Sequence, residues 1–497
     1  MNFLNASLFF ILFVSVFTLI LLPFLTTWKI ARNFSLYSSL LQLVVFGFAF
    51  CSAYVPPLKQ LLRIGIKDFE FTASASHLDT LYLYFLTNFT IDELSVFFVF
   101  LTLLLNPICI LAAWSTVRDR VVLFQFVLHL VTLLLLIVFT VRNLLFFYIA
   151  FESILIPMFL LIAYWGSRDR KIHAAYQFFL YTLVGSVLML VAIVYMYVQV
   201  GTLHLDALLS HPFDIETSRF LWFALFISFA VKVPMIPFHI WLPEAHVEAP
   251  TAGSVLLAGI LLKMGTYGLI RFSIPLFPEA SMYFQPLIYL ISLIGIVYSV
   301  FSTIRQVDLK KIIAYSSVGH MNYVTLGIGS GTLMGLEGSL FLMLGHGFVS
   351  SALFLCVGSI YERYHTRIIL YYGGLIFGMP IFGFFFLLFT LANVSLPGTS
   401  NFVGEFLVLS GVFISSPFVA LVAASVVILS AVYAFWLYNR VMFGLPRSFM
   451  NAFSDSNRRE FLLYLVLGTC VLFTGLFPNF FLDVFHSALL PTIDRLN

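Results

Sequence analysis

Charged residues are scarce in this chain of 497 residues: Asp, Glu, Lys and Arg make up 9%, and the formal net charge is only +3. Ordinary soluble domains carry roughly 25% charged residues. A soluble protein of this length could not cover its surface with 25 basic and 22 acidic side chains. The composition therefore excludes a soluble enzyme, a disordered chain and a basic nucleic-acid-binding protein.

Cofactor and disulfide motifs are also missing. The four cysteines are far apart and form no C-x-x-C pair, so neither a disulfide framework nor an iron–sulfur or covalent haem site is expected. We expect Cys51, Cys109, Cys356 and Cys470 to be core or lipid-facing thiols. Neither a Walker motif nor a dinucleotide-binding G-x-G-x-x-G occurs. The sequence predicts no metal and no cofactor bound by this chain.

Apolar residues are abundant, at 61% of the chain, and mean hydropathy is +1.05. About 20 apolar residues span a bilayer as a helix, so the sequence predicts an all-α polytopic membrane protein with about fourteen spans. The first apolar run has no basic residue before it, and we interpret it as a first span rather than a targeting peptide. The predicted spans are 7–25, 35–54, 92–114, 121–140, 143–165, 174–199, 219–241, 252–271, 284–304, 311–329, 334–359, 375–410, 417–439 and 461–482.

Two of these spans should be discontinuous. The seventh contains Pro234 and Pro237, and the long twelfth contains Pro397. Proline removes a backbone donor and clashes with the preceding turn of a helix. Broken helices are tolerated inside a membrane only where protein or a wet cavity surrounds them.

The basic residues of the loops predict the orientation. Sixteen Lys and Arg residues follow odd-numbered spans, and seven lie in the other loops and the termini. The positive-inside rule then places both termini on the outer face. The smaller group consists of Lys59, Arg63, Lys67, Arg142, Arg219, Arg271 and Arg495.

The two broken spans lie five helices apart, which predicts two five-helix repeats, 120–272 and 283–442. Helices 1–3 (1–119) would precede these repeats, and helix 14 (443–497) would follow them. An odd number of helices per repeat gives consecutive copies opposite orientations. Inverted repeats with discontinuous helices are typical of ion-coupled transporters, whose binding sites lie near the midplane.

Six predicted helices each carry one ionisable residue near the middle of the membrane. Each Lys or carboxylate at that depth costs about 2.5–3.5 kcal/mol on insertion scales. A chain of proton-transfer sites would explain this cost, and Glu152 and Lys232 could form a switchable pair within it. The alternative is two structural ion pairs and two hydrogen-bonded histidines. The residues are Glu152, Lys232, Lys263, His320, His346 and Glu405.

The segment HIWLPEAHVEAPTAGS places four more titratable residues close together: His239, Glu244, His246 and Glu248. Their spacing matches no standard metal-ligand pattern. We treat them as secondary candidates for a surface where protons enter or leave, with a metal site or a structural loop as alternatives.

Several long segments resemble the antiporter-like, proton-pumping subunits of mitochondrial NADH–ubiquinone oxidoreductase (respiratory complex I), in particular its subunit 4 type. The segments are FYIAFESILIPMFLLIAYWGSRDRKIHAAYQFFLYTLVGS, VKVPMIPFHIWLPEAHVEAPTAGSVLLAGILLKMGTYGLIRF, RQVDLKKIIAYSSVGHMN, LGHGFVSSALFLCVGSIYERYHTR and LANVSLPGTSNFVGEF. The resemblance is strong from about residue 90 to 445.

The resemblance implies fourteen helices, two inverted five-helix repeats and proton translocation coupled to quinone reduction elsewhere in a complex. Its membrane-embedded Glu, Lys and His positions fall on the same six residues identified above. NADH, FMN, iron–sulfur clusters and ubiquinone would be bound by other subunits of the complex. The partners of this chain would be those other subunits, including neighbouring antiporter-like subunits, and membrane lipids. The chain would lie in the mitochondrial inner membrane. Both termini would then face the intermembrane space. A cation/proton antiporter subunit without a redox partner and a purely structural spacer are the rival hypotheses.

Overall fold

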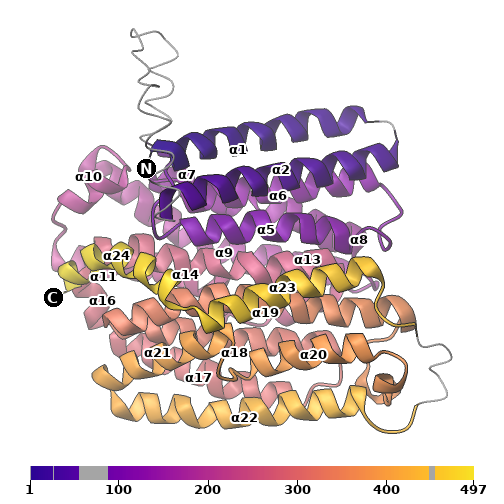
Figure 1. Cartoon of the computed structure of the whole chain (residues 1–497). Helices are drawn as coiled ribbons and strands as arrows, with labels where there is room; N and C mark the ends of the chain where they lie inside the picture. Colours follow the sequence, from indigo (N-terminus) through magenta and orange to yellow (C-terminus); the bar gives the residue numbers. More distant parts are fainter. Residues whose placement is uncertain (1, 26, 55–87, 447–453, 497) are drawn as a thin grey trace. The chain divides into compact units, whose positions relative to one another are not determined.

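A computed structural model describes residues 2–25, 27–54, 88–446 and 454–496 of the chain (Figure 1). About 83% of the residues are helical, and no strand occurs in the described ranges. The predicted loop residues Lys59, Arg63, Lys67 and Arg447 lie outside those ranges. The predicted all-α class is confirmed.

The chain forms two compact units, and each is described by itself. Unit 1 comprises Met1–Met158 and Met196–His211. Its helices pack in sequence order, α1 on α2, α2 on α5, α5 on α6 and α6 on α7. They are α1 (Asn2–Leu21), α2 (Trp28–Tyr54), α5 (Val96–Ala112), α6 (Val121–Thr140), α7 (Leu144–Ser153) and α10 (Leu205–Ser210).

Unit 2 comprises Phe159–Tyr195 and Pro212–Asn497. Helices α8 (Leu155–Trp165) and α9 (Lys171–Val200) continue across the division between the units. The other helices are α11 (Ile215–Lys232), α12 (Trp241–Glu248), α13 (Thr251–Leu256), α14 (Leu262–Gly268), α15 (Ile274–Leu276), α16 (Pro278–Tyr283), α17 (Gln285–Ile304), α18 (Leu309–Gly329), α19 (Leu333–Tyr364), α20 (Pro380–Asn393), α21 (Ser400–Ser415), α22 (Pro417–Met442), α23 (Arg458–Leu476) and α24 (Asn479–Leu496).

Ten helical segments of the described chain are long and apolar enough to cross a membrane. Every one of the fourteen predicted spans coincides with helix, although some of these helices are short or interrupted. Fourteen crossings therefore remain a prediction. Two candidate spans, Thr251–Leu276 and Leu333–Tyr364, are fully buried over their most apolar stretch.

The structure corrects several predicted boundaries. Helix α2 begins at Trp28, so Lys29 and Arg32 lie on the helix rather than in the preceding loop. The predicted fourteenth span ends early at Leu476, and a separate helix, α24, follows Pro478. The fifth span divides into α7 and α8, because Pro157 cannot donate the backbone hydrogen bond that would join the two helices.

Both predicted helix breaks are present, and their backbones match. In the first, which separates α11 from α12, Val233 N–H donates to Phe229 O (2.9 Å) and Met235 N–H to Ala230 O (2.9 Å). In the second, between α20 and α21, the same two bonds join Val394 to Thr390 (3.1 Å) and Leu396 to Leu391 (3.1 Å). Each residue of the second break lies 161 positions after its counterpart (394 minus 233, 396 minus 235).

The loops that precede α7 and α18 also resemble each other. Asn143 caps α7 and forms an isolated antiparallel bridge with His204, and Asp308 caps α18 and forms the same bridge with Ile368. In both loops the cap is a short polar side chain whose oxygen accepts a backbone N–H of the first helical turn.

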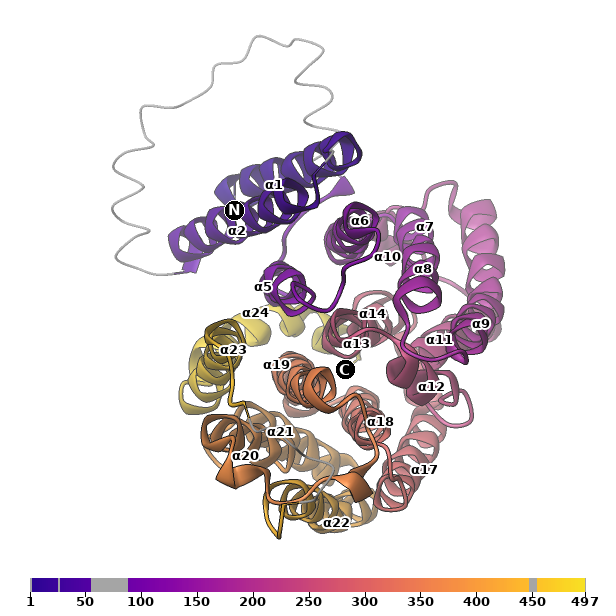
Figure 2. The ribbon, with the colours of Figure 1, turned by 90° about the vertical axis from the view of Figure 1, so that its right-hand side faces the viewer.

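Helix α19 lies at the centre of unit 2, surrounded by α13, α18, α21 and α23 (Figure 2). It approaches α21 very closely through glycine. A Cβ at Gly404 would lie 2.7 Å from the backbone of Leu342, and one at Gly338 would lie 2.6 Å from Val408 N. The numbering rises along one helix as it falls along the other, so the two helices are antiparallel. Small residues that permit such contact are characteristic of helix interfaces in membranes.

Candidate functional site

Lys263 and His346 form a buried polar pair in unit 2. Lys263 lies on α14, His346 lies on α19, and Lys263 Nζ is 2.8 Å from His346 Nδ1. Both side chains are almost completely buried. A buried cation without polar partners would be very unfavourable, so this contact is a specific feature of the core.

The backbone before Lys263 supplies its second partner. Residues Leu257–Leu261 form a π-helical segment, and Lys263 Nζ donates to Ala258 O at 2.5 Å. π-Helical turns change the intrahelical bonding pattern and occur often at functional sites. The sequence placed Lys263 in an uninterrupted helix and gave no indication of this irregularity.

His320 and Glu405 form the second pair. His320 Nδ1, on α18, lies 2.8 Å from Glu405 Oε1, on α21, and both residues are buried. His320 Nε2 lies 3.2 Å from Asn393 Oδ1 at the end of α20. Asn393 Nδ2 in turn donates to the Tyr433 hydroxyl at 3.4 Å. Both nitrogens of the His320 ring therefore have polar partners.

The two pairs meet at their histidines. The ring centroids of His320 and His346 are 5.6 Å apart, with the ring planes at 50°. Lys263, His346, His320 and Glu405 therefore form a continuous group across α14, α19, α18 and α21. The structure brings together four of the six predicted midplane residues.

Sequence reasoning missed the uncharged polar residues of this group. Besides Asn393, the start of α21 contributes Ser400 and Asn401, which are completely buried. A Cβ at Gly345, beside His346, would lie 2.9 Å from Asn401 Oδ1. An Asn beside a proline-containing break was the available signal, since a polar amide within a membrane is itself unusual.

Lys232 is the last residue of α11 and is buried in unit 2. The Trp241 indole donates to the carbonyl of Val231 at 2.9 Å and satisfies one of the free carbonyls at the end of α11. A Cβ at Gly265 would lie 3.3 Å from Lys232 Cβ, so the helix carrying Lys263 packs directly on this end of α11.

Glu152 is the sixth predicted residue and is half-buried on α7, one residue before that helix ends. It belongs to unit 1, whereas the five other residues belong to unit 2. The proposed pairing of Glu152 with Lys232 therefore stays a prediction.

The four secondary candidates lie in different surroundings. His246 and Glu248 are buried on α12, whereas Glu244 is partly exposed and accepts a hydrogen bond from Lys311 at 2.8 Å. His239 contacts the rings of Tyr298 and Tyr315, with centroids 5.0 Å and 6.4 Å away. No cluster of three or more His, Cys, Asp or Glu suited to a metal occurs in the part of the chain that the structure describes.

Several charges that the sequence assigned only to topology are in fact buried. Arg367 and Lys310, which the sequence placed in loops, are 0% and 3% exposed. Arg367 donates to Val247 O and to Ser167 Oγ, and Lys310 Nζ donates to Ala249 O at 2.7 Å. Sequence position alone could not distinguish these two cations from solvated loop charges.

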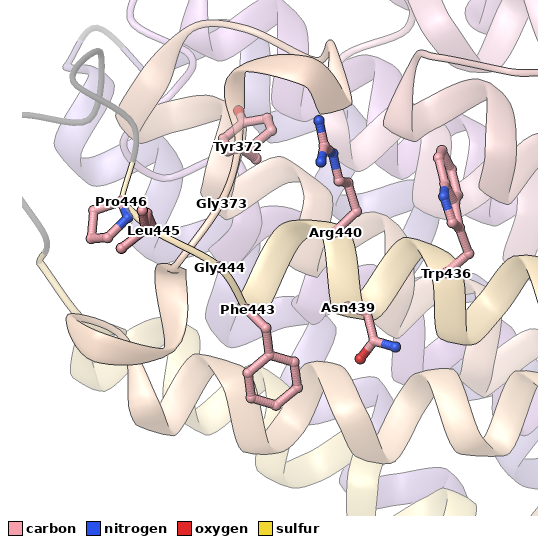
Figure 3. Close-up of a pocket in the computed structure, with 9 residues that line it drawn as sticks. All are labelled: Tyr372, Gly373, Trp436, Asn439, Arg440, Phe443, Gly444, Leu445 and Pro446. Carbon is pink, nitrogen blue, oxygen red and sulfur yellow. The ribbon is translucent and has the colours of Figure 1, made fainter.

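Two pockets differ in character. A small one borders the second pair and is lined by residues that include His320, Glu405, Ser299, Ser316 and Tyr433. A larger one, of about 760 Å³, lies at the end of α22 and contains none of the midplane residues (Figure 3). The larger pocket is lined by Tyr372, Gly373, Trp436, Asn439, Arg440, Phe443, Gly444, Leu445 and Pro446.

Fold and site together define a class: a helical membrane protein with discontinuous helices and a buried line of Lys, His and Glu. This is the architecture of ion-coupled transport proteins. Residues 141–431, more than half of the chain, match the family model described as NADH:quinone oxidoreductase/Mrp antiporter, transmembrane. The chain belongs to this family.

Curated relatives within this family are chain 4 proteins of NADH-ubiquinone oxidoreductase. NADH-ubiquinone oxidoreductase chain 4 of Marchantia polymorpha is 57% identical over 399 residues, covering 80% of this chain and 81% of that protein. The chain 4 protein of Chondrus crispus is 50% identical over 476 residues, covering 95% and 94%. These identities and the multi-pass helical fold support a mitochondrial inner-membrane protein.

Solved structures of respiratory membrane complexes contain chains with the same fold. A chain of respiratory complex I from Thermus thermophilus with bound NADH superposes with a TM-score of 0.82 at 29% identity, covering 99% of this chain and 100% of that one. A chain of an archaeal membrane-bound sulfane sulfur reductase has a TM-score of 0.84 at 18% identity, which shows a shared fold alone.

Proposed function

We propose that this chain is a proton-translocating membrane-arm subunit of an NADH:ubiquinone oxidoreductase. Protons pass along Lys263, His346, His320 and Glu405, with Lys232 next to Lys263. The single observation that carries the proposal is the continuous buried contact from Lys263 to Glu405 through two adjacent histidines.

The chemistry of the four residues suits proton transfer. Histidine accepts a proton on one ring nitrogen and releases one from the other. A buried Lys can exchange its proton readily, because burial disfavours the charged form. Asn393 orients His320, and Ser400 and Asn401 supply polar groups beside His346, where water could complete the hydrogen-bonded path.

The two helix breaks and the two bridged loops support a pair of five-helix repeats, 120–272 and 283–442. By the odd-helix argument these would be inverted. Glu152 and Lys232 would form the switchable pair of the first repeat, in which separation of the two charges favours release of the Lys proton. Fourteen membrane crossings, with both termini in the intermembrane space, complete the proposed topology.

The partners would be other subunits of the complex, including neighbouring antiporter-like subunits. Membrane lipids would surround the chain. NADH, FMN, iron–sulfur clusters and ubiquinone would be held by those other subunits. The rival function, a cation/proton antiporter subunit without a redox partner, is not favoured, because the relatives at 50–57% identity are oxidoreductase chains. A structural spacer fails to explain why charges occupy such costly positions.

The test uses the complete complex, purified and reconstituted into liposomes. Protons translocated per NADH oxidised are measured for Lys232→Ala, Glu152→Ala and Lys263→Gln, and assembly is checked by native gel with in-gel NADH oxidation. We expect assembled complexes with strongly reduced proton translocation and coupled activity. Full proton stoichiometry in all three variants would contradict the proposal.

A further inference from the structure

A cluster of buried charges lies at the end of unit 2 where α12 ends and α18 begins. Lys310 Nζ, in the first turn of α18, donates to Ala249 O (2.7 Å) and to Ser254 Oγ (3.4 Å). Lys310 also lies within electrostatic range of Arg367, Asp308 and Glu248. Nothing in the site described above uses this lysine.

The neighbour of this cluster is His246. Its side chain is completely buried and stacks on Phe354 of α19, with centroids 4.7 Å apart and ring planes at 8°. Neither ring nitrogen has a hydrogen-bond partner within the described residues. A fully buried imidazole with both nitrogens unsatisfied requires an explanation, and none of the packing around it supplies one.

Ser254 connects the two residues. Its hydroxyl accepts from Lys310 Nζ and donates to the backbone carbonyl of His246 at 3.0 Å. His246 lies within electrostatic range of both Lys310 and Lys263. The imidazole is thus close enough to interact with both Lys310, near the end of the helix bundle, and the central Lys263.

The register between α19 and the segment from α13 to α14 shows at which level of α19 His246 and Lys263 lie. Thr251 contacts Gly358, Lys263 contacts His346 and Thr266 contacts Met343, so the segment from α13 to α14 runs antiparallel to α19. Lys263 extends back along its helix to Ala258 O, which this register places opposite Ser351. Phe354, on which His246 stacks, follows Ser351 by three residues, a rise of about 5 Å along α19, so His246 contacts α19 about one helical turn from the level of Ala258 O.

We propose that Lys310 and His246 form the proton-uptake branch of this subunit, delivering protons to Lys263. This inference rests on the proposed function and extends it to two residues outside the central group. The surface is close: Val307, three residues before Lys310, is 54% exposed. By the loop-charge argument this end of the bundle faces the matrix.

The transfer conserves protons and charge. An N–H bond of the Lys310 ammonium breaks, and the proton forms an N–H bond on the unprotonated nitrogen of His246, directly or through one water. His246 then releases the proton from its other nitrogen to the neutral amine of Lys263. The Glu248 carboxylate stabilises the positive charge while Lys310 is protonated, and a proton from the matrix reloads the neutral amine of Lys310.

The competing explanation is purely structural. The last carbonyls of a helix lack intrahelical donors and carry partial negative charge. Arg367 and Lys310 donate to Val247 O and Ala249 O at the end of α12. They could therefore serve only as caps, and His246 could serve only to pack against Phe354.

Two conservative substitutions separate these explanations in the reconstituted complex. Lys310→Arg retains the positive charge and the donors, but arginine does not deprotonate in proteins. His246→Phe retains an aromatic ring against Phe354 and removes both nitrogens. The controls are Lys311→Arg, the same exchange at the adjacent, partly exposed residue, and His173→Phe, at an exposed histidine.

We expect both test variants to assemble normally, and NADH-driven proton translocation to fall about tenfold or more, as when a positioned proton-transfer group is removed. Both controls should behave as the unaltered complex. If His246→Phe fails to assemble, His246→Gln is tested in its place, because its amide is similar in size to the imidazole. This variant should show the same loss of proton translocation.

Lys263→Gln serves as the reference for the proposed function. If Lys263→Gln abolishes translocation while Lys310→Arg and His246→Phe translocate normally, the uptake branch is wrong and the central path stands. If all three translocate normally, the proposed function itself is wrong.

Discussion

The two helix breaks have nearly the same backbone and different chemistry. The two hydrogen bonds given above recur at an offset of 161 residues, and so does a third, from Phe238 N–H to Met235 O (2.7 Å) in the first break and from Thr399 N–H to Leu396 O (3.1 Å) in the second. Yet α11 ends with Lys232, and α20 ends with Asn393 at the equivalent position (393 minus 232). The first break thus supplies a cation, whereas the second supplies an amide that contacts His320. The two breaks therefore share one hydrogen-bonded backbone arrangement but differ in the side chain at the end of the preceding helix.

The difference is also visible in how each break is made. Pro234 lacks an N–H, so it interrupts the helix by removing a donor. Its counterpart Ser395 keeps the N–H and donates to Ala392 O at 3.2 Å, with φ at +64° in the left-handed region. A proline is therefore not required at this position of the break, although both breaks contain one nearby, Pro237 in the first and Pro397 in the second.

Making the first break resemble the second should have the largest effect. Lys232→Asn removes the titratable group while keeping a polar side chain at the end of α11. We expect proton translocation per NADH to fall about tenfold or more, the change that a barrier increase of ~1.4 kcal/mol produces. Unchanged translocation in reconstituted, assembled complex would mean that the two breaks are chemically interchangeable.

Glu405→Gln tests the carboxylate that follows the second break. The substitution keeps the size of the side chain and its ability to accept a hydrogen bond from His320, but it removes the charge. Hydrogen bonds to charged groups contribute about 1.5–3 kcal/mol, so we expect a loss of translocation of about tenfold. Glu337→Gln, at the partly exposed carboxylate that lies 2.7 Å from His486, is the matched control and should change translocation little.

Asn393→Leu should have a smaller effect on the same reaction. It removes the partner of His320 Nε2 and leaves the contact with Glu405 in place. A neutral hydrogen bond contributes about 1 kcal/mol, which corresponds to about fivefold in an equilibrium. Translocation equal to that of the unaltered complex would show that the second break only shapes the backbone; Asn393→Gln, with the same amide, should retain more activity than Asn393→Leu.

The smallest effect concerns the backbone alone. Glycine adopts positive φ without the steric cost that other residues incur, so Ser395→Gly should raise the free energy of unfolding by about 0.5–1 kcal/mol. Ser395→Val should lower it by at least as much, because β-branched residues tolerate this conformation poorly. Thermal unfolding of the purified complex measures both. A more stable Ser395→Val variant would refute the strain argument.

The positions of the helices and breaks followed largely from sequence. Apolar runs of about 20 residues and prolines within them are local signals, and α6 begins and ends at the predicted residues 121 and 140. The π-helical segment before Lys263 was missed, because hydropathy does not distinguish π-helical from α-helical turns. The division of the fifth span after Ser153 was missed although Pro157 was a local signal for it. The separate helix α24 was missed because its apolar beginning merged with the preceding span.

Six midplane residues could be named, because burying an ionisable group in a membrane is costly whatever the fold. The pairing of four of them could not be predicted: Lys263 and His346 are 83 positions apart, and His320 and Glu405 are 85 apart. The sequence also treated Lys310 and Arg367 as loop charges, since a basic residue next to a span is usually solvated. Only the folded chain shows both side chains turned into the protein.

By itself the sequence determined the class of protein, the helices and the two breaks. It also identified the ionisable residues whose burial in a membrane costs so much free energy that a function is needed to explain them. The tertiary structure decided which of these residues touch, which uncharged side chains orient them, and which loop cations are buried. The physical reason is that hydropathy and proline act within one helix. Contacts between Lys, His and Glu depend instead on the antiparallel register of helices, which glycines such as Gly404 permit to approach closely.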